Sequence, residues 1–265
     1  MPRPRNGSRV PAPIVALAAV AVAFFVLPLA GLLTQVPWRE LVTQLGRPEL
    51  LAALRISAVA SLGAVALSIV FGVPLALVLA RAEFPGKHLV RALTTLPMVL
   101  PPVVGGIALL LAFGRRGLAG QWLDRWFGVS LPFTTVATVL AATFVSMPFF
   151  VITVEAGLRA MDRRLEDAAA TLGSSRWRTL LRITLPQVAP SLGAGAALCW
   201  VRALGEFGAT ITFAGNLPGT TQTLPLAAYL ALEGRLEAAI VLSLILLVLS
   251  LAVLVLLRDR WFPST

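Results

Sequence analysis

Long apolar runs with few or no charged residues are the feature that most limits what this chain of 265 residues can fold into. A helix needs about 20 consecutive apolar residues to cross the hydrocarbon core of a bilayer. Because lipid offers the backbone no hydrogen bonds, helices are the economical spanning structure, and the runs lack the alternation of barrel strands. We therefore expect an all-α polytopic membrane protein with a single domain over residues 1–265. The runs predict six transmembrane helices, at residues 13–33, 56–80, 92–113, 133–154, 190–214 and 238–257.

The charge of the chain supports the same interpretation. Only 13% of its residues are charged, whereas about 25% is typical of a soluble domain. The net charge of +10 could suggest nucleic acid, but basic residues are about twice as frequent in alternate polar segments, as the positive-inside rule describes. This bias predicts cytosolic termini, external segments at residues 38–54 and 215–237, and lipid rather than nucleic acid as a partner. The first span is too long for a typical signal peptide, so we expect a retained helix.

Few residues are available for catalysis, redox chemistry or metal binding. Cys199 is the only cysteine and His88 the only histidine, so neither a disulfide nor a histidine metal cluster is expected. The P-loop of an ATPase requires G-x-x-x-x-G-K-[ST], and the single lysine, Lys87, is followed by histidine. We therefore expect no catalytic residue, no cofactor and no metal, and any ATPase must be a separate chain. An ion-coupled secondary transporter is the alternative class, although such proteins usually keep several ionisable groups near the midplane.

A polar stretch at residues 159–186 separates the fourth and fifth spans and has the pattern of two short helices. Asp162 can cap the first helix, and Gly173 can end it in a left-handed conformation. The serine pair 174–175 can cap the second helix, which Pro186 should end. Alanines on the first helix would let a partner surface approach closely, whereas the alternative is an amphipathic linker lying on the membrane. The residues expected on that face are Leu165, Ala168, Ala169 and Leu172.

Two charged residues, Arg202 and Glu206, interrupt the fifth span. They are four residues apart, so they share a helical face, and because an unpaired charge in the bilayer is costly we expect them to pair. The pair is either a structural contact that fixes helix packing or part of a translocation path or gate. Nearby prolines and glycines would line such a path or allow close helix packing, and these residues are Pro101, Gly105, Gly205 and Gly208.

The stretch 159–186 resembles the EAA loop of ATP-binding-cassette (ABC) importer permeases, whose pattern is E-A-A-x3-G-x9-I-x-L-P. The spacing matches throughout, with aspartate at the strict acidic position and glutamate just before it. The resemblance implies a type I ABC importer fold and a coupling segment on which a separate ATPase subunit docks. The two acidic residues could meet basic groups of that subunit. The coupling residues that it implies are Glu166, Asp167, Ala168, Ala169, Leu172, Gly173, Ile183, Leu185 and Pro186.

The run ALGEFG at 203–208, followed by AGNLPG at 214–219 and TQTLP at 221–225, resembles the molybdate permease family. Sulfate and tungstate permeases share the first two parts and remain the alternatives for the substrate, whereas the third part favours molybdate. The resemblance implies a permease of the bacterial inner membrane that forms the translocation path for an oxyanion. It also implies a homodimer of permeases, two cytosolic ABC ATPase subunits and an extracytoplasmic solute-binding protein as partners.

Overall fold

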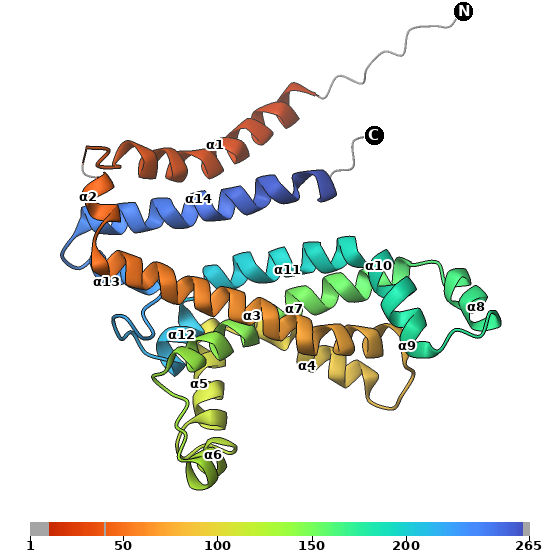
Figure 1. Ribbon diagram of the computed structural model, residues 1–265. Helices are drawn as coiled ribbons and strands as arrows, with labels where there is room; N and C mark the ends of the chain where they lie inside the picture. Colours follow the sequence, from red (N-terminus) through yellow and green to blue (C-terminus); the bar gives the residue numbers. More distant parts are fainter. Residues whose placement is uncertain (1–10, 40, 262–265) are drawn as a thin grey trace, which may run out of the picture.

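The computed structural model describes residues 11–39 and 41–261 of the chain, and no strand occurs in that part. Figure 1 shows long helices running side by side, with the short helices of the coupling segment at one end. The elements are α1 (Ala12–Thr34), α2 (Leu41–Leu45), α3 (Pro48–Arg81), α4 (Lys87–Val99), α5 (Pro102–Phe113), α6 (Gly120–Phe127), α7 (Thr135–Ala160), α8 (Arg164–Thr171), α9 (Arg176–Thr179), the π-helix η1 (Leu180–Thr184), α10 (Leu185–Gln187), α11 (Ala189–Leu204), α12 (Gly208–Phe213), α13 (Leu224–Ala231) and α14 (Leu236–Trp261).

Four of the six expected spans are continuous helices long and apolar enough to cross a membrane. They are α1, α3, α7 and α14, and each covers most of its predicted range. Helix α3 begins at Pro48, eight residues before the expected start at 56, and α7 continues to Ala160 rather than ending at 154. The all-helical class and the location of these four spans are therefore confirmed. The count of six is not confirmed, because the other two predicted spans are not continuous helices.

The predicted span 92–113 is instead two helices, α4 and α5, separated at Leu100 and Pro101. Leu100 has ψ of 133°, the extended conformation that the residue before a proline prefers. Pro101 and the following Pro102 have no N–H to continue the hydrogen-bond ladder of α4. Helix α5, with 12 residues, is too short to span a bilayer alone.

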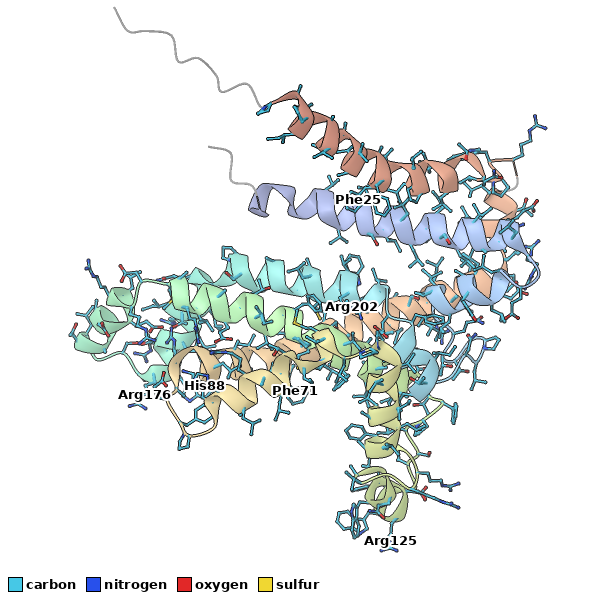
Figure 2. The ribbon with its side chains drawn as sticks, turned by 180° about the vertical axis from the view of Figure 1, so that it is seen from behind. Phe25, Phe71, His88, Arg125, Arg176 and Arg202 are labelled. Carbon is cyan, nitrogen blue, oxygen red and sulfur yellow. The ribbon has the colours of Figure 1, made fainter. Side chains whose placement is uncertain are left out.

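The predicted span 190–214 is also broken, because α11 ends at Leu204 and α12 begins at Gly208. The predicted external segment 215–237 is not entirely a loop, since it contains α13. Figures 1 and 2 show that α5 and α6 project from the bundle, across the direction of the long helices. The two broken helices therefore give the molecule an irregular region beside an otherwise regular bundle.

Helices α3, α7 and α11 contact one another and form the centre of the bundle (Figure 1). Part of their shared interface is built from small residues, namely Ala64, Ala142 and Ala203, as is usual where membrane helices pack closely. Trp200 donates its indole N–H to the Ser61 hydroxyl at 2.9 Å, and the backbone N–H of Leu224 donates to the Ser57 hydroxyl at 2.7 Å. These bonds satisfy polar groups away from water and fix α11 and α13 against α3.

Helix α1 lies apart from this centre and runs beside α14 (Figure 1). None of its residues is buried within the chain. A continuous apolar surface of this kind is what lipid or another apolar partner covers in a membrane protein.

Helices α5 and α12 pack so closely that Gly106 has no room for a side chain. A Cβ added there would lie 1.6 Å from the Thr212 hydroxyl oxygen and 2.8 Å from the Ala209 carbonyl oxygen. The Ala209 oxygen belongs to the backbone of α12 and cannot turn away. The two short helices therefore form one tightly joined pair.

We expect Gly106→Ala to lower the free energy of unfolding by about 1–3 kcal/mol, because the added methyl must push α5 and α12 apart. The matched control is Gly105→Ala, where a Cβ would meet only the Phe144 ring, at 3.1 Å. That ring can shift, so the control should cost less. Detergent melting temperatures of the two variants would check this, and equal losses would contradict the close packing.

Candidate functional site

The first helix of the coupling segment ends as its sequence predicts and begins one residue later than a cap at Asp162 would place it, since Arg163 is the N-cap residue. The Asp162 carboxylate accepts a hydrogen bond from the backbone N–H of Arg164 at 3.0 Å, which satisfies a free donor at the start of α8. Gly173 has φ of +76°, the left-handed conformation expected of it. The N–H of Ser174 reaches back to the Ala169 carbonyl at 2.9 Å, so the chain reverses immediately after α8.

The second helix differs from the prediction at its far end. Ser175 caps α9, since its hydroxyl accepts from the N–H of Arg178 at 3.4 Å. Pro186, however, does not end the helix, because it lies inside α10, and the chain turns only at Val188. The π turn η1 precedes the proline, with the N–H of Leu185 bonded to the Leu180 carbonyl. A proline ring clashes with the carbonyl four residues before it in a regular α-helix, and a wider turn relieves that clash.

The face predicted for partner contact is largely open. Leu172 is 88% exposed, and Leu165 and Ala168 are also exposed. Ala169 is the exception, because it is buried against the chain itself. A single exposed leucine is ordinary, but Leu165 and Leu172 are exposed on the same face, and neighbouring exposed apolar side chains of this kind are typical of an interaction surface.

Of the two acidic residues in α8, only Asp167 is exposed. Glu166 instead binds residues of its own chain: its carboxylate pairs with the Arg81 guanidinium at 2.8 Å and accepts a hydrogen bond from the Thr184 hydroxyl. The interpretation that Glu166 is free to meet a partner is therefore wrong. Glu166 joins α8 to the end of α3 and to η1, and it holds the two helices of the coupling segment together.

Burial by itself raises the pKa of the Glu166 carboxyl, but hydrogen bonds from Arg81 and Thr184 and the charge of Arg81 outweigh it. The pKa of Glu166 is therefore below its usual value of 4.5. A carboxyl with a lowered pKa contributes stability that is fully present above its usual pKa and is lost as the pH falls through the lowered value.

We accordingly expect the melting temperature of the parent protein to fall more steeply below pH 4.5 than that of Glu166→Gln, which has no carboxyl to protonate. Thr184→Val removes one of the two donors and should give an intermediate slope, whereas Thr184→Ser keeps the hydroxyl and should behave as the parent. Thermal melts in detergent, taken from neutral pH downward, measure these slopes. Parallel curves for parent and Glu166→Gln would show that the ion pair adds no stability.

The remaining motif residues complete the segment. Ile183 and Leu185 are half-buried, and Pro186 is exposed. They lie where η1 and α10 lead into α11 (Figure 1). The coupling segment is thus connected directly to the helix that carries the membrane charge pair.

Arg202 and Glu206 form the predicted pair, with 2.7 Å between the Arg202 Nη1 and the Glu206 Oε2 atoms. The expectation that both lie on one continuous helix is wrong, since Glu206 lies in the break between α11 and α12. Its second oxygen, Oε1, accepts from the backbone N–H of Ala209 at 2.8 Å. One carboxylate therefore neutralises an arginine of α11 and satisfies a free donor at the start of α12.

The small residues near the pair have different environments. Gly208 is buried against α5, where an added Cβ would lie 2.7 Å from Pro102, as close helix packing requires. Gly205 is exposed and borders no other helix. Gly105 packs near the Phe144 ring of α7, and Pro101 is exposed at the start of α5. The structure thus brings the two helix breaks together through Gly208, and it separates Gly205 and Gly105 from that contact.

A second ionic cluster escaped the sequence analysis. Glu155 of α7 is buried and pairs with Arg91 of α4 and with Arg159 one turn later in α7. The predicted span stopped at residue 154 and so left Glu155 out. The i, i+4 spacing of Glu155 and Arg159 was a signal for half of the cluster, but nothing local indicated Arg91.

A cavity of about 200 Å³ lies elsewhere, at the end of the bundle formed by α2, α13 and the start of α14. Its lining includes Gln44, Arg47 and Arg235 and contains neither Arg202 nor Glu206. The candidate path is therefore placed by the charge pair and the two helix breaks rather than by this cavity.

The chain is similar to known transport proteins over most of its length. It is 44% identical to the molybdenum transport system permease protein ModB of Mycobacterium tuberculosis over 89% of each chain. It is 36% identical to the sulfate transport system permease protein CysT of Escherichia coli K12, over 86% of this chain and 83% of the relative. Among solved structures, a bacterial ABC transporter involved in the import of alginate superposes with a TM-score of 0.66 over 93% of each chain, at 18% identity.

The alginate transporter shares the fold, which is that of ABC importer permeases, as the coupling-segment motif implied. Residues 68–263 match the family model described as the binding-protein-dependent transport system inner membrane component. That range includes the coupling segment and the charge pair, so the two candidate sites lie within the shared part of the chain. The chain therefore belongs to the family of binding-protein-dependent transport system inner membrane components.

Proposed function

We propose that this chain is the transmembrane permease subunit of an ATP-driven importer for an oxyanion, with molybdate as the substrate. The observation that carries the proposal is the 44% identity to a molybdenum permease over 89% of both chains. Sulfate is the second candidate, because a sulfate permease is 36% identical over a similar length. Tungstate is a further alternative, since the motifs at 203–208 and 214–219 are shared among these permeases.

The partners in this proposal are a second copy of the chain, two cytosolic ATPase subunits and an extracytoplasmic solute-binding protein. The family description itself names dependence on a binding protein. An exposed face on α8, carrying Leu165, Ala168 and Leu172, supports docking of an ATPase subunit at the coupling segment. The chain supplies the path and the docking surface, and the ATPase supplies the energy and binds the ATP.

In the proposed mechanism the helix breaks work as hinges. Helices α5 and α12 pack on each other and each follows a break, so they can move together relative to α4 and α11. Glu206 holds one hinge in shape by binding both Arg202 and the N–H of Ala209. We propose that the pair lies in or near the path and does not hold the anion tightly, because a buried carboxylate repels an oxyanion.

We propose a bacterial inner-membrane location with both termini cytosolic. The charge bias that suggests this orientation rests partly on Arg3, Arg5 and Arg9, which lie outside the described residues. Single cysteines at 172 and 217 in a Cys199→Ser background would test it, since both leucines are exposed. Labelling of position 172 only from the cytosol, and of 217 only from outside, is the expected result, and the reverse would overturn the orientation.

Uptake into proteoliposomes that contain the permease, its ATPase subunit and the binding protein tests the function. We expect uptake of labelled molybdate that requires ATP and is reduced more by unlabelled tungstate than by sulfate. Preferential uptake of sulfate would favour the second candidate. Uptake by the chain alone, driven by an ion gradient, would show instead that it is a secondary transporter.

A further inference from the structure

The cluster around Glu155 joins three helices at the same end of the bundle as the coupling segment. The Glu155 side chain is only 8% exposed, and its Oε1 atom contacts the Arg91 guanidinium and the Arg159 Nη2 atom, the latter at 2.8 Å. Arg91 belongs to α4, whereas Glu155 and Arg159 belong to α7. A buried carboxylate is tolerated only when it is paired in this way. The cluster therefore fixes the start of the broken helix α4–α5 to α7.

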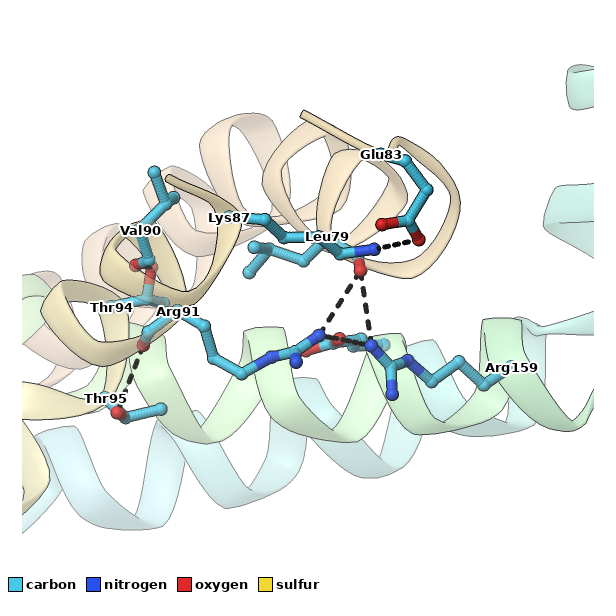
Figure 3. Close-up of polar contacts among 9 residues, drawn as sticks. Leu79, Glu83, Lys87, Val90, Arg91, Thr94, Thr95 and Arg159 are labelled. Carbon is cyan, nitrogen blue, oxygen red and sulfur yellow. Dashed lines mark hydrogen bonds and ion pairs between the residues drawn. The ribbon is translucent and has the colours of Figure 1, made fainter. Parts of the chain in front are cut away.

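Both arginines also bind the end of α3. Figure 3 shows the Leu79 carbonyl accepting from Arg91 at 3.3 Å and from Arg159 at 3.4 Å. Carbonyls in the last turn of a helix have no partner within it, and positive charge there is favoured by the helix dipole. The two guanidiniums supply both, and so they tie the end of α3 to α4 and α7.

The same turn of α3 is bound to the coupling segment. Arg81, two residues after Leu79, pairs with Glu166 of α8 at 2.8 Å. An ion pair thus connects α8 to α3, and the hydrogen bond from Arg91 to the Leu79 carbonyl connects α3 to α4. Helix α4 ends at the break at Leu100, beyond which α5 packs against α12. The contacts form an unbroken route from the docking surface to the pair of short helices.

We propose that Arg91 and Glu155 are positioning residues that make α4 move with the coupling segment. A displacement of α8 is then transmitted through α4 to the helix break at Leu100 and Pro101, where α5 begins. The inference rests on the proposed function, in which an ATPase displaces α8. Its physical basis is the rigidity of one body made from α8, the end of α3, the start of α4 and the end of α7. In the described part of the chain, the Arg91–Glu155 contact is the only ion pair between α4 and α7.

The structure offers a closely matched pair of variants. Arg91→Gln and Arg159→Gln each leave Glu155 paired with one remaining guanidinium, and each removes one hydrogen bond to the Leu79 carbonyl. Neither change leaves an unpaired buried charge, so both proteins should fold. Only Arg91→Gln removes the ion pair between α4 and α7. Glu83→Gln is a further control at the same end: the exposed carboxylate pairs with the 11% exposed side chain of Lys87, and the glutamine oxygen can still accept a hydrogen bond from that ammonium.

The first measurement uses the complete complex in proteoliposomes and compares labelled molybdate imported with ATP hydrolysed. We expect Arg91→Gln to lower this ratio about fivefold or more while the ATPase subunit stays bound. Arg159→Gln and Glu83→Gln should keep the parent ratio. A purely stabilising role would lower the amount of complex in both arginine variants and leave the ratio unchanged in both. Equal ratios for the two arginine variants would therefore overturn the proposal.

A second measurement does not depend on transport. Spin labels at cysteines placed at 93 on α4 and 165 on α8, both exposed positions, report the distance between the two helices in a Cys199→Ser background. The distribution should be narrow in the parent and in Arg159→Gln and broad in Arg91→Gln. Three identical distributions would refute the inference even if ATP-driven uptake is observed. Conversely, absence of uptake in the parent, with the expected broadening in Arg91→Gln, would refute the proposed function alone.

Discussion

Arg202→Gln is expected to destabilise the protein by about 3–5 kcal/mol, because it leaves the Glu206 carboxylate buried without its counter-ion. Glu206 is 2% exposed, whereas the Arg202 side chain is 30% exposed. Glu206→Gln should therefore cost less, since the arginine left behind can still reach polar surroundings. A glutamine can also go on accepting the hydrogen bond from Ala209. Both single variants should lose most of their uptake, with Arg202→Gln the more severe.

The double variant Arg202→Gln, Glu206→Gln removes both charges and should be milder than the sum of the two single effects. Melting temperatures and uptake rates of the four proteins form a double-mutant cycle whose coupling energy should reach about 1–3 kcal/mol. The exposed pair Arg115–Asp124, with 3.2 Å between the Arg115 Nε and the Asp124 Oδ1 atoms, supplies the control. Arg115→Gln should cost less than about 1 kcal/mol. Additive effects at Arg202 and Glu206 would show that the two residues do not stabilise each other.

Gly173→Arg is expected to abolish uptake while leaving membrane insertion intact. The left-handed backbone at Gly173 costs any other residue about 1–2 kcal/mol, and a bulky cation would stand beside the exposed face of α8. A Cβ at this position meets nothing within 4 Å, so the change creates no clash inside the chain. The loss should therefore appear as failure to bind the ATPase subunit, measured by co-purification.

Two variants separate the backbone strain from the loss of docking. Gly173→Ala imposes the strain without the bulk and should keep part of the binding. Gly219→Arg imposes both the strain and the bulky cation at a position far along the chain from the coupling segment. Gly219 has nearly the same backbone conformation, with φ of +73°, and it also has open space around it. It should keep the ATPase subunit bound. Normal co-purification and uptake in Gly173→Arg would show that α8 is not the docking helix.

Features that depend on neighbours in the chain were predictable from the sequence. The length of an apolar run decides whether a helix can span a bilayer, so α1, α3, α7 and α14 were located correctly. The stop at Gly173 and the hydrogen bond from Asp162 to the start of α8 depend on the backbone of a few residues. The stop at Gly173 is present as predicted, whereas Asp162 binds the helix start from one residue before the N-cap, Arg163. The Arg202–Glu206 pair was predicted from the helical spacing of four residues. It forms although α11 ends at Leu204, because the N–H groups of Gly205 and Glu206 still bond back to carbonyls of α11.

Features that depend on distant parts of the chain were decided only by the tertiary structure. A proline or glycine can kink a span or merely tolerate close packing, and only the contact of Gly208 with Pro102 shows that both helices break at the same place. Glu166 could have faced a partner, but folding brings Arg81 to it from 85 positions earlier. Glu155 binds Arg91 across 64 positions. Local sequence determined which residues needed a counter-charge. The packing of α3, α4 and α7 determined which residue supplied it, because a charge removed from water pairs with the opposite charge that the fold places within reach.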